Sequence, residues 1–180
     1  MSAKELVEQA VHELFDRRDA AAVDRYWSPG YIEHSIVGAD GLRGLRDLAG
    51  SLPEGFRRAR TRVIADRDLV VAHGRYEGLG AGPIVAFDVW RVDHDKIVEH
   101  WDAHQAWSQA IQTGVWEAVV DKVHRIIAEG EFVFTQGEGL LREEPTAFYD
   151  LFRVENDRLA EHWDVVFTKP AELAHGNGLF

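Results

Sequence analysis

The sequence predicts an α+β protein in which three helices pack on a curved, mostly antiparallel sheet to form a cone, and a second sheet packs on the first. Apolar residues recur at helical spacing near the N-terminus, and β-rich segments separated by turn residues follow from Arg60 onwards. The second half of the chain then repeats parts of this sheet without the helices.

The helical layer is predicted from start and stop signals. Ser2 and Glu5 have the spacing of a capping box, in which two side chains satisfy free N–H groups at a helix start. Asp19 and Asp40 are placed to cap a second, short helix and a third helix. The segments that end or separate these helices are Ser28-Pro29-Gly30, the short extended piece Tyr31 to Ser35, and Pro53 with Gly55.

The first sheet is predicted from four β-rich segments with turn-forming residues between them. These segments are 61–65, 69–77, 84–92 and 97–104. Asp66-Arg67-Asp68 and Asp93-His94-Asp95 are typical hairpin turns. Three helices followed by such a meander are expected to cover one concave face of the sheet.

The second half of the chain contains an ordered repeat of this sheet. Arg62 recurs 63 positions later as Arg125. The residues that recur 62 positions later are Asp88, Arg91, Val92, Glu99, His100, Trp101 and Asp102, as Asp150, Arg153, Val154, Glu161, His162, Trp163 and Asp164. We therefore predict a complete cone-shaped domain over residues 1–107 and a partial repeat over residues 115–180, with a short helix at 115–122 and strands. Its uncovered apolar face should pack on the first sheet or on another chain.

Composition excludes several classes of partner. The chain has 20 basic and 31 acidic residues and a net charge of −11, so neither nucleic acid nor a membrane surface is an expected partner. Cys is absent, which excludes disulfides and Cys-ligated metals. The charged N-terminus and the lack of a long apolar run predict a cytoplasmic location.

No metal and no cofactor are predicted. His100 and His104 have a spacing that suits one metal ion only on a helix, because on a strand they lie about 13 Å apart. The segment Gly78 to Gly82 is interpreted as a hairpin loop and not as a phosphate-binding turn between strand and helix.

Several motifs resemble a known family. They are Tyr31-Ile32-Glu33-His34, Asp40-Gly41, Lys96 to Asp102, Tyr149 to Glu155 and the tail His175 to Phe180. Together they resemble the SnoaL-like polyketide-cyclase branch of the nuclear-transport-factor-2-like superfamily, over residues 1–107 in full and 123–180 in part. The resemblance implies a conical cavity for a small apolar molecule and homodimers built through the sheets. A fused second sheet would imitate that dimer contact within one chain.

The resemblance also directs attention to particular positions. The Asp that serves as the base in the polyketide cyclases corresponds here to Gln105, which cannot accept a proton at neutral pH, and the assisting His corresponds to Tyr76. The specific cyclase mechanism is therefore not expected. By the same resemblance the Trp101 face of the last strand points into the cavity, and alternation places His100 and Asp102 on the outer face.

The His-Trp-Asp phrase has two interpretations. Because it recurs in a copy that lacks helices, a structural role is favoured. The alternative is that His100 and Asp102 act as a base with its orienting partner. A one-residue slip of the strand would bring His100, Asp102 and His104 into the cavity instead.

The predicted function is that of a cofactor-free acid–base enzyme, of isomerase, cyclase or hydrolase type, acting on a small apolar carbonyl or epoxide compound. The candidate catalytic residues are His34, Tyr76, Asp88 and Asp102, and the candidate substrate-binding residues are Trp27, Tyr31, Trp101 and Gln105. The alternative is a non-catalytic small-molecule binder or a degenerate enzyme kept as an interaction module, which the Gln at position 105 favours.

Overall fold

The computed structural model describes residues 1–107 and 118–180 and has the predicted α+β architecture. The helices are α1 (Ala3–Val11), the π-helical turn η1 (His12–Asp16), α2 (Ala22–Tyr26) and α3 (Gly41–Ser51). The strands are β1 (Trp27–Glu33), β2 (Arg57–Asp66), β3 (Leu69–Glu77), β4 (Ile84–Asp93), β5 (Lys96–Ala106), β6 (Ala118–Glu129), β7 (Phe132–Leu141), β8 (Glu144–Glu155) and β9 (Arg158–Thr168).

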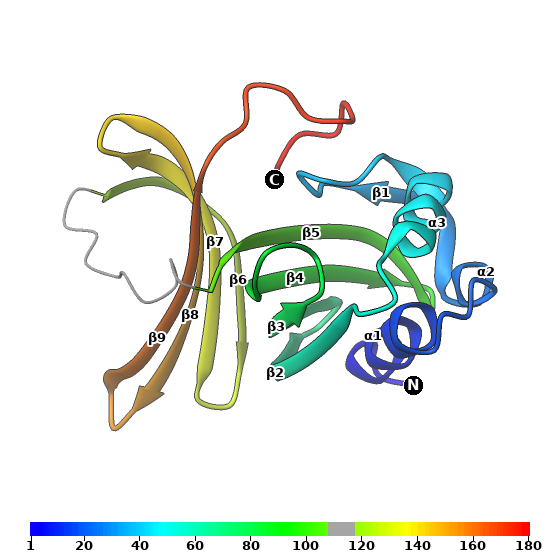
Figure 1. Ribbon diagram of the computed structural model, residues 1–180. Helices are drawn as coiled ribbons and strands as arrows, with labels where there is room; N and C mark the ends of the chain where they lie inside the picture. The colour runs from blue at the N-terminus through cyan, green and yellow to red at the C-terminus, as the bar shows by residue number, and fades with distance from the viewer. Residues whose placement is uncertain (108–117) are drawn as a thin grey trace.

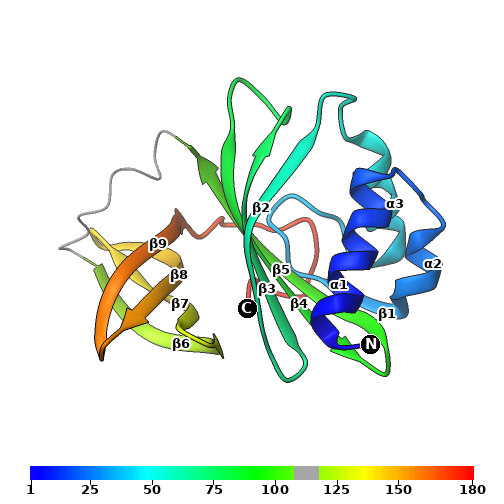
Figure 2. The ribbon, with the colours of Figure 1, turned by 90° about the horizontal axis from the view of Figure 1, so that it is seen from below.

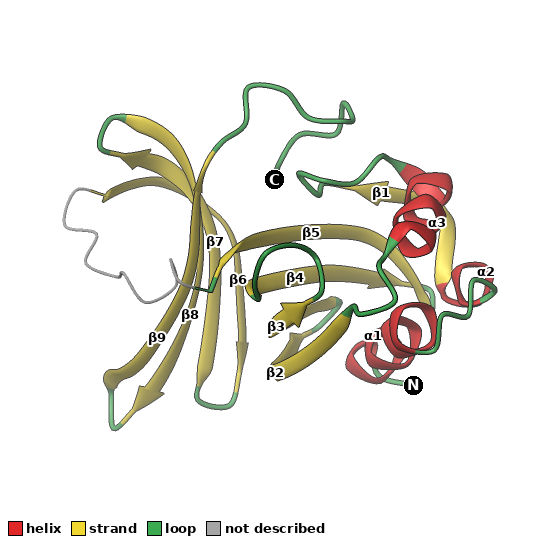
Figure 3. Cartoon of the chain, in the orientation of Figure 1, coloured by secondary structure: helices red, strands yellow, loops and turns green. Residues whose placement is uncertain are grey.

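The strands form two sheets that lie against each other (Figure 1). Sheet A has the order β1-β5-β4-β3-β2, in which only β1 runs parallel to its neighbour, and sheet B is the antiparallel meander β6-β7-β8-β9. Seen from below, the helices cover one face of sheet A and sheet B covers the other (Figure 2). Among the described residues the helices gather beside sheet A, and sheet B consists of strands and loops (Figure 3).

Of the three predicted capping signals, only that of α1 forms a side-chain cap. The capping box of Ser2 and Glu5 is present at α1. Asp19 accepts a hydrogen bond from the N–H of Ala21, the N-cap of α2. Asp40 is the N-cap residue of α3, but its carboxylate accepts from the N–H of Glu33 at 3.0 Å and so ties α3 to β1.

The helix predicted at 115–122 is wrong over its described part. Residues 118–122 belong to β6, and residues 115–117 lie outside the described residues. Val119 and Val120 pair with β7, where β-branched side chains are favoured, and this long-range ladder overrides the helical pattern. None of the described helices has the length and apolar character needed to cross a membrane.

Two apolar cores hold the layers together. The first lies between the helices and sheet A and includes Leu6, Val11, Leu14, Trp27 and Trp90. The second lies between the sheets and includes Phe87, Trp101, Phe134, Tyr149 and Val165. Sheet A is therefore buried on both faces, although it is mostly antiparallel and one face of such a sheet commonly faces water.

The contacts between the sheets follow the sequence repeat. Arg125 of sheet B lies over the ring of Trp101 of sheet A at 3.6 Å, and Arg62 of sheet A lies over Trp163 of sheet B at 3.7 Å. Because Arg62 and Trp101 recur as Arg125 and Trp163, the two pairs are exchanged, as in the isologous contact of a twofold dimer. The geometry is that of a dimer interface within one chain, and descent of sheet B from a second copy of the domain stays a prediction.

Replacing either arginine should loosen the contact between the sheets. Arg125→Met and Arg62→Met keep an apolar side chain but remove the planar cation, so each should lower the free energy of unfolding by about 1–2 kcal/mol. Urea unfolding measures the change, and Arg67→Met, at an exposed position, is the control. Losses no larger than that of the control would contradict the importance of these pairs.

His73 provides a pH-dependent test of the same core. It stacks on Phe87 at 4.6 Å and lies near Trp163, and burial together with the charge of Arg62 lowers the pKa of His73 to about 4. A lowered His pKa means that the unfolded chain binds the proton more readily, so stability is complete above about pH 6.5 and is lost as the pH falls towards 4.

We expect His73 to account for about 2 kcal/mol of the stability lost between pH 7.5 and pH 5. His73→Gln should remove that part of the pH dependence, as measured by urea unfolding at the two pH values. His94→Gln, which changes an exposed His, should keep the wild-type dependence. Identical pH dependence in the wild type and His73→Gln would refute the assignment.

Candidate active site

A cavity of about 400 Å³ lies between the helical layer and the concave face of sheet A. Its wall is mostly apolar, with side chains such as Phe15, Leu45, Leu48, Phe56 and Trp90. The polar and ionisable residues of its lining include Tyr31, Glu33, Ser35, Arg58, Tyr76, Asp88, His100, Asp102 and His104. A few converging polar groups in an apolar enclosure are typical of a small-molecule site.

Strand register brings the ionisable groups together. Asp88 of β4 lies directly opposite Asp102 of β5, and the parallel pairing of β1 with β5 places Glu33 opposite His100. Because side chains alternate along a strand, His100, Asp102 and His104 all point to the cavity side of β5. Three strands thus deliver five ionisable side chains to the cavity wall.

A continuous chain of contacts runs across the cavity wall. The Tyr31 hydroxyl donates to Glu33 Oε2 at 2.6 Å, and Glu33 Oε1 lies 2.9 Å from His100 Nδ1. His100 Nε2 lies 3.3 Å from Asp88 Oδ1, and the Tyr76 hydroxyl donates to the other oxygen of Asp88. The imidazole is therefore held between two carboxylates, each of which also accepts from a tyrosine.

The charges of this chain stabilise one another. Burial by itself lowers the pKa of His100, but the charges and hydrogen bonds of Glu33 and Asp88 raise it well above the usual value. Burial alone would raise the pKa of Glu33, but the His100 charge, together with hydrogen bonds from His100, Tyr31 and the Ser35 N–H, lowers it. The pair is thus an imidazolium and a carboxylate at neutral pH.

Asp102 differs from the other carboxylates. Its Oδ2 accepts a hydrogen bond from the Ser35 hydroxyl at 2.9 Å, and its buried Oδ1 has no hydrogen-bond partner. Burial raises the pKa of Asp102, and the neighbouring charges of Asp88 and Glu33 add to that rise against the opposing charge of His100. Asp102 is therefore more readily protonated than an ordinary aspartate, which marks it as a candidate for proton transfer.

Tyr76 remains a neutral phenol. Burial and the charge of Asp88 raise the pKa of Tyr76 well above its ordinary value. A neutral phenol in this position is a hydrogen-bond donor and not a base. Its ring packs edge-on against Phe56, with the ring centroids 6.0 Å apart.

The predicted orientation of β5 is wrong. In the structure the face of β5 that carries Trp101 and Gln105 points to sheet B, so these two predicted substrate-binding residues lie outside the cavity. Trp101 lies under Arg125 of sheet B. Gln105 also faces sheet B, where its amide donates to the Asp164 carbonyl at 3.2 Å and its oxygen accepts from the Val166 N–H. Since both faces of sheet A are buried, apolar residues occur on both sides of β5, and alternation alone does not identify the cavity face.

His34 also lies outside the cavity lining. Its Nε2 lies 2.9 Å from Glu99 Oε1, its Nδ1 lies 2.9 Å from the Gly178 carbonyl oxygen, and its ring stacks on Trp101. The residue sits at the end of β1, where the C-terminal segment returns to sheet A (Figure 1). The predicted place of His34 in the cavity is therefore wrong, and its contacts are those of a residue that anchors the C-terminal segment.

The remaining candidates line the cavity, although Asp102 was predicted on the outer face of β5 and reaches the cavity only because the orientation of that strand is reversed. Tyr76, Asp88, Asp102, Trp27 and Tyr31 all line the cavity, while their roles stay predictions. Sequence reasoning missed Glu33 as a site residue. The available signal was the Tyr-x-Glu spacing of the Tyr31 to His34 motif, which places the phenol and the carboxylate on one face of a strand.

The chain belongs to the family of SnoaL-like domain proteins, because the family model matches residues 7–100, more than half of the chain. That match ends at His100 and leaves sheet B outside. No curated protein matches the sequence.

Solved structures support the same fold. A nuclear-transport-factor-2-like protein from Burkholderia thailandensis is 22% identical, with a TM-score of 0.50, over 63% of this chain and 99% of that chain. A loop-truncation variant of IdmH, a protein from Streptomyces antibioticus, is 15% identical, with a TM-score of 0.50, over 58% of this chain and 93% of that chain. At these identities the likeness is evidence for the fold only.

Removing the charge of Glu33 should destabilise the protein and lower the pKa of His100. A raised His pKa contributes stability that is complete below about pH 6.5 and is lost as the pH rises through the folded-state value. Glu33→Gln should therefore lower the free energy of unfolding by about 3 kcal/mol at pH 6 and weaken its decline at higher pH.

Urea unfolding across pH and NMR titration of the imidazole measure these two effects. Glu131→Gln alters an exposed carboxylate of sheet B and serves as the control. An unchanged His100 titration in Glu33→Gln would contradict the ion pair.

Proposed function

We propose that the protein is a cofactor-free acid–base enzyme, of isomerase, cyclase or hydrolase type, acting on a small apolar carbonyl or epoxide compound. The observation that carries the proposal is Asp102, a buried carboxyl with a raised pKa and one unpartnered oxygen, in a largely apolar cavity. Perturbed carboxyls in such enclosures serve as proton carriers because their pKa approaches working pH.

In the proposed reaction of a carbonyl compound, the Asp102 carboxylate removes a proton from the carbon next to the carbonyl. The Tyr76 hydroxyl turns from Asp88 to the developing enolate oxygen and donates a hydrogen bond to it. Asp102 then returns the proton to another carbon, or the enolate carbon forms a ring bond to an internal carbonyl carbon, whose C=O π bond breaks, and the resulting alkoxide takes the proton from Asp102. The His100 imidazolium, held by Glu33 and Asp88, favours the negative charge of the intermediate.

With an epoxide as substrate, the same residues would act, but Asp102 would start the reaction in its protonated form. Protonated Asp102 would donate its proton to the epoxide oxygen while a water molecule attacks the ring carbon. The proton released by that water would return to the Asp102 carboxylate. Both reactions use one carboxyl that carries a proton in one step and lacks it in the other, and the raised pKa of Asp102 supports that role.

The alternative is a non-catalytic binder of the same class of small molecule. Its main support in the sequence was Gln105 at the expected base position. Gln105 contacts sheet B and not the cavity, so that substitution carries no weight for the chemistry inside it.

The decisive experiment compares the wild type with Asp102→Asn on a panel of apolar ketones, lactones and epoxides. Mass spectrometry measures turnover and a thermal-shift assay measures binding. The asparagine keeps shape and polarity but cannot carry the proton, so turnover should fall by roughly 10²-fold or more while binding persists. The pH–rate profile of the wild type should show a limb above the ordinary Asp range.

Asp93→Asn is the matched control, because Asp93 ends β4 at the surface and pairs with His94. Its turnover should equal that of the wild type. Binding without turnover for every compound would favour the non-catalytic binder. Full turnover by Asp102→Asn would exclude Asp102 as the proton carrier.

A further inference from the structure

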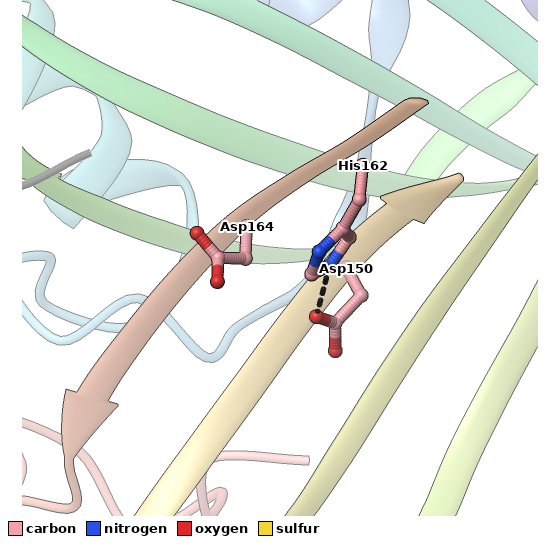
Figure 4. A group of neighbouring side chains, drawn as sticks. All are labelled: Asp150, His162 and Asp164. Carbon is pink, nitrogen blue, oxygen red and sulfur yellow. Dashed lines mark hydrogen bonds and ion pairs between the residues drawn. The ribbon is translucent and has the colours of Figure 1, made fainter. Parts of the chain in front are cut away.

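Sheet B carries a compact group of three potential metal ligands. Asp150 of β8 and His162 and Asp164 of β9 direct their side chains to one place (Figure 4). One ligand atom from each residue lies within 4.8 Å of the others. Their neighbours Tyr149, Leu151 and Val165 point to the core between the sheets, so alternation places the trio on the face of sheet B that points away from sheet A.

Asp150, His162 and Asp164 repeat Asp88, His100 and Asp102 of the cavity, but they lack the hydrogen-bond partners that the cavity residues have. Asp150 and Asp164 lie directly opposite each other, as Asp88 and Asp102 do in sheet A. In sheet A both nitrogens of His100 contact carboxylates. Asp88 and Asp102 also accept from Tyr76 and Ser35. Sheet B has no counterpart of β1 among its strands, so no residue of the described chain takes the place of Glu33 beside the imidazole.

Within sheet B the existing contacts leave ligand capacity unused. His162 Nε2 lies 2.8 Å from Asp150 Oδ1, and the ring stacks on Phe152 at 4.6 Å, which fixes its plane. Asp164 is only 8% exposed. Its main-chain carbonyl accepts from Gln105, and among the described residues no other side chain or N–H from another residue is hydrogen-bonded to its carboxylate.

A buried carboxylate without such a partner, opposite a second carboxylate, is costly unless a positive charge neutralises it. Two carboxylates and a neutral imidazole carry a charge of −2, which matches a divalent cation. Imidazole with carboxylates is a ligand set that suits zinc, manganese and cobalt better than calcium or magnesium. Ligands about 2.0–2.2 Å from one ion lie roughly 3–4 Å apart, so atoms within 4.8 Å need only small side-chain rotations.

We propose that Asp150, His162 and Asp164 bind a divalent transition-metal ion, of the zinc class, that links β8 to β9. The ion would replace the hydrogen bond between His162 and Asp150 and neutralise the two facing carboxylates. Water would complete its coordination, because the His162 side chain is partly exposed and leaves the site open on one side. This inference does not depend on the proposed reaction in the cavity.

The test uses the full chain after treatment with a chelator, with Zn²⁺ as the titrant in calorimetry and Co²⁺ as the spectroscopic probe. We expect one equivalent of Zn²⁺ to bind, a rise in Tm on binding, and a Co²⁺ absorption band of a mixed nitrogen–oxygen site. His162→Gln and Asp164→Asn should each weaken binding by roughly tenfold or more and abolish the Co²⁺ band.

The matched control is His94→Gln, since His94 and Asp93 form an exposed pair at 2.9 Å without a third ligand. It should bind the metal as tightly as the wild type. Circular dichroism verifies that the variants fold, and Asp150→Asn provides a third variant if one of the others does not. Failure to bind, or weak binding of several equivalents that Asp164→Asn and His162→Gln leave unchanged, would overturn the proposal.

Discussion

The packing of sheet B on sheet A is the contact on which the rest of the structure depends. It buries Trp101 and Phe87 on one face of sheet A and thereby fixes which face of β5 is left for the cavity. His100 and Asp102 alternate with Trp101, so the burial of the indole between the sheets turns the imidazole and the carboxyl towards the helices. The exchanged stacking of Arg125 on Trp101 and of Arg62 on Trp163 fastens this contact on both sides.

The cavity then brings ionisable groups together inside a largely apolar wall. Glu33 and Asp88 flank His100 and raise its pKa, and the charge of His100 in turn lowers the pKa of Glu33 against the effect of burial. Asp102 does not pair with His100. It accepts one hydrogen bond from Ser35, and its other oxygen has no partner. The separation of roles between paired and unpaired carboxyls is what makes proton transfer a reasonable chemistry for this cavity.

The two sheets show how surroundings change the use of one set of residues. The Asp–His–Asp arrangement of β4 and β5 meets Glu33, Tyr76 and Ser35, which hydrogen-bond to it, while Oδ1 of Asp102 has no partner. The same arrangement on β8 and β9 meets none of these, and Asp164 is left buried opposite Asp150. A proton network in one sheet and a metal site in the other are the chemical consequences that we infer.

The sequence by itself determined the helical layer and the hairpins of both sheets, because helix starts and turns are local signals, and the family resemblance directed attention to Tyr76, which lines the cavity. The tertiary structure decided the phase of β5, the placement of His34 against Gly178 and the extended form of residues 118–122. Each depends on a partner far away in the chain. When both faces of a sheet are buried, the pattern of apolar and polar residues does not show which face of a strand points to the cavity. Only the packing of the second sheet decides that orientation.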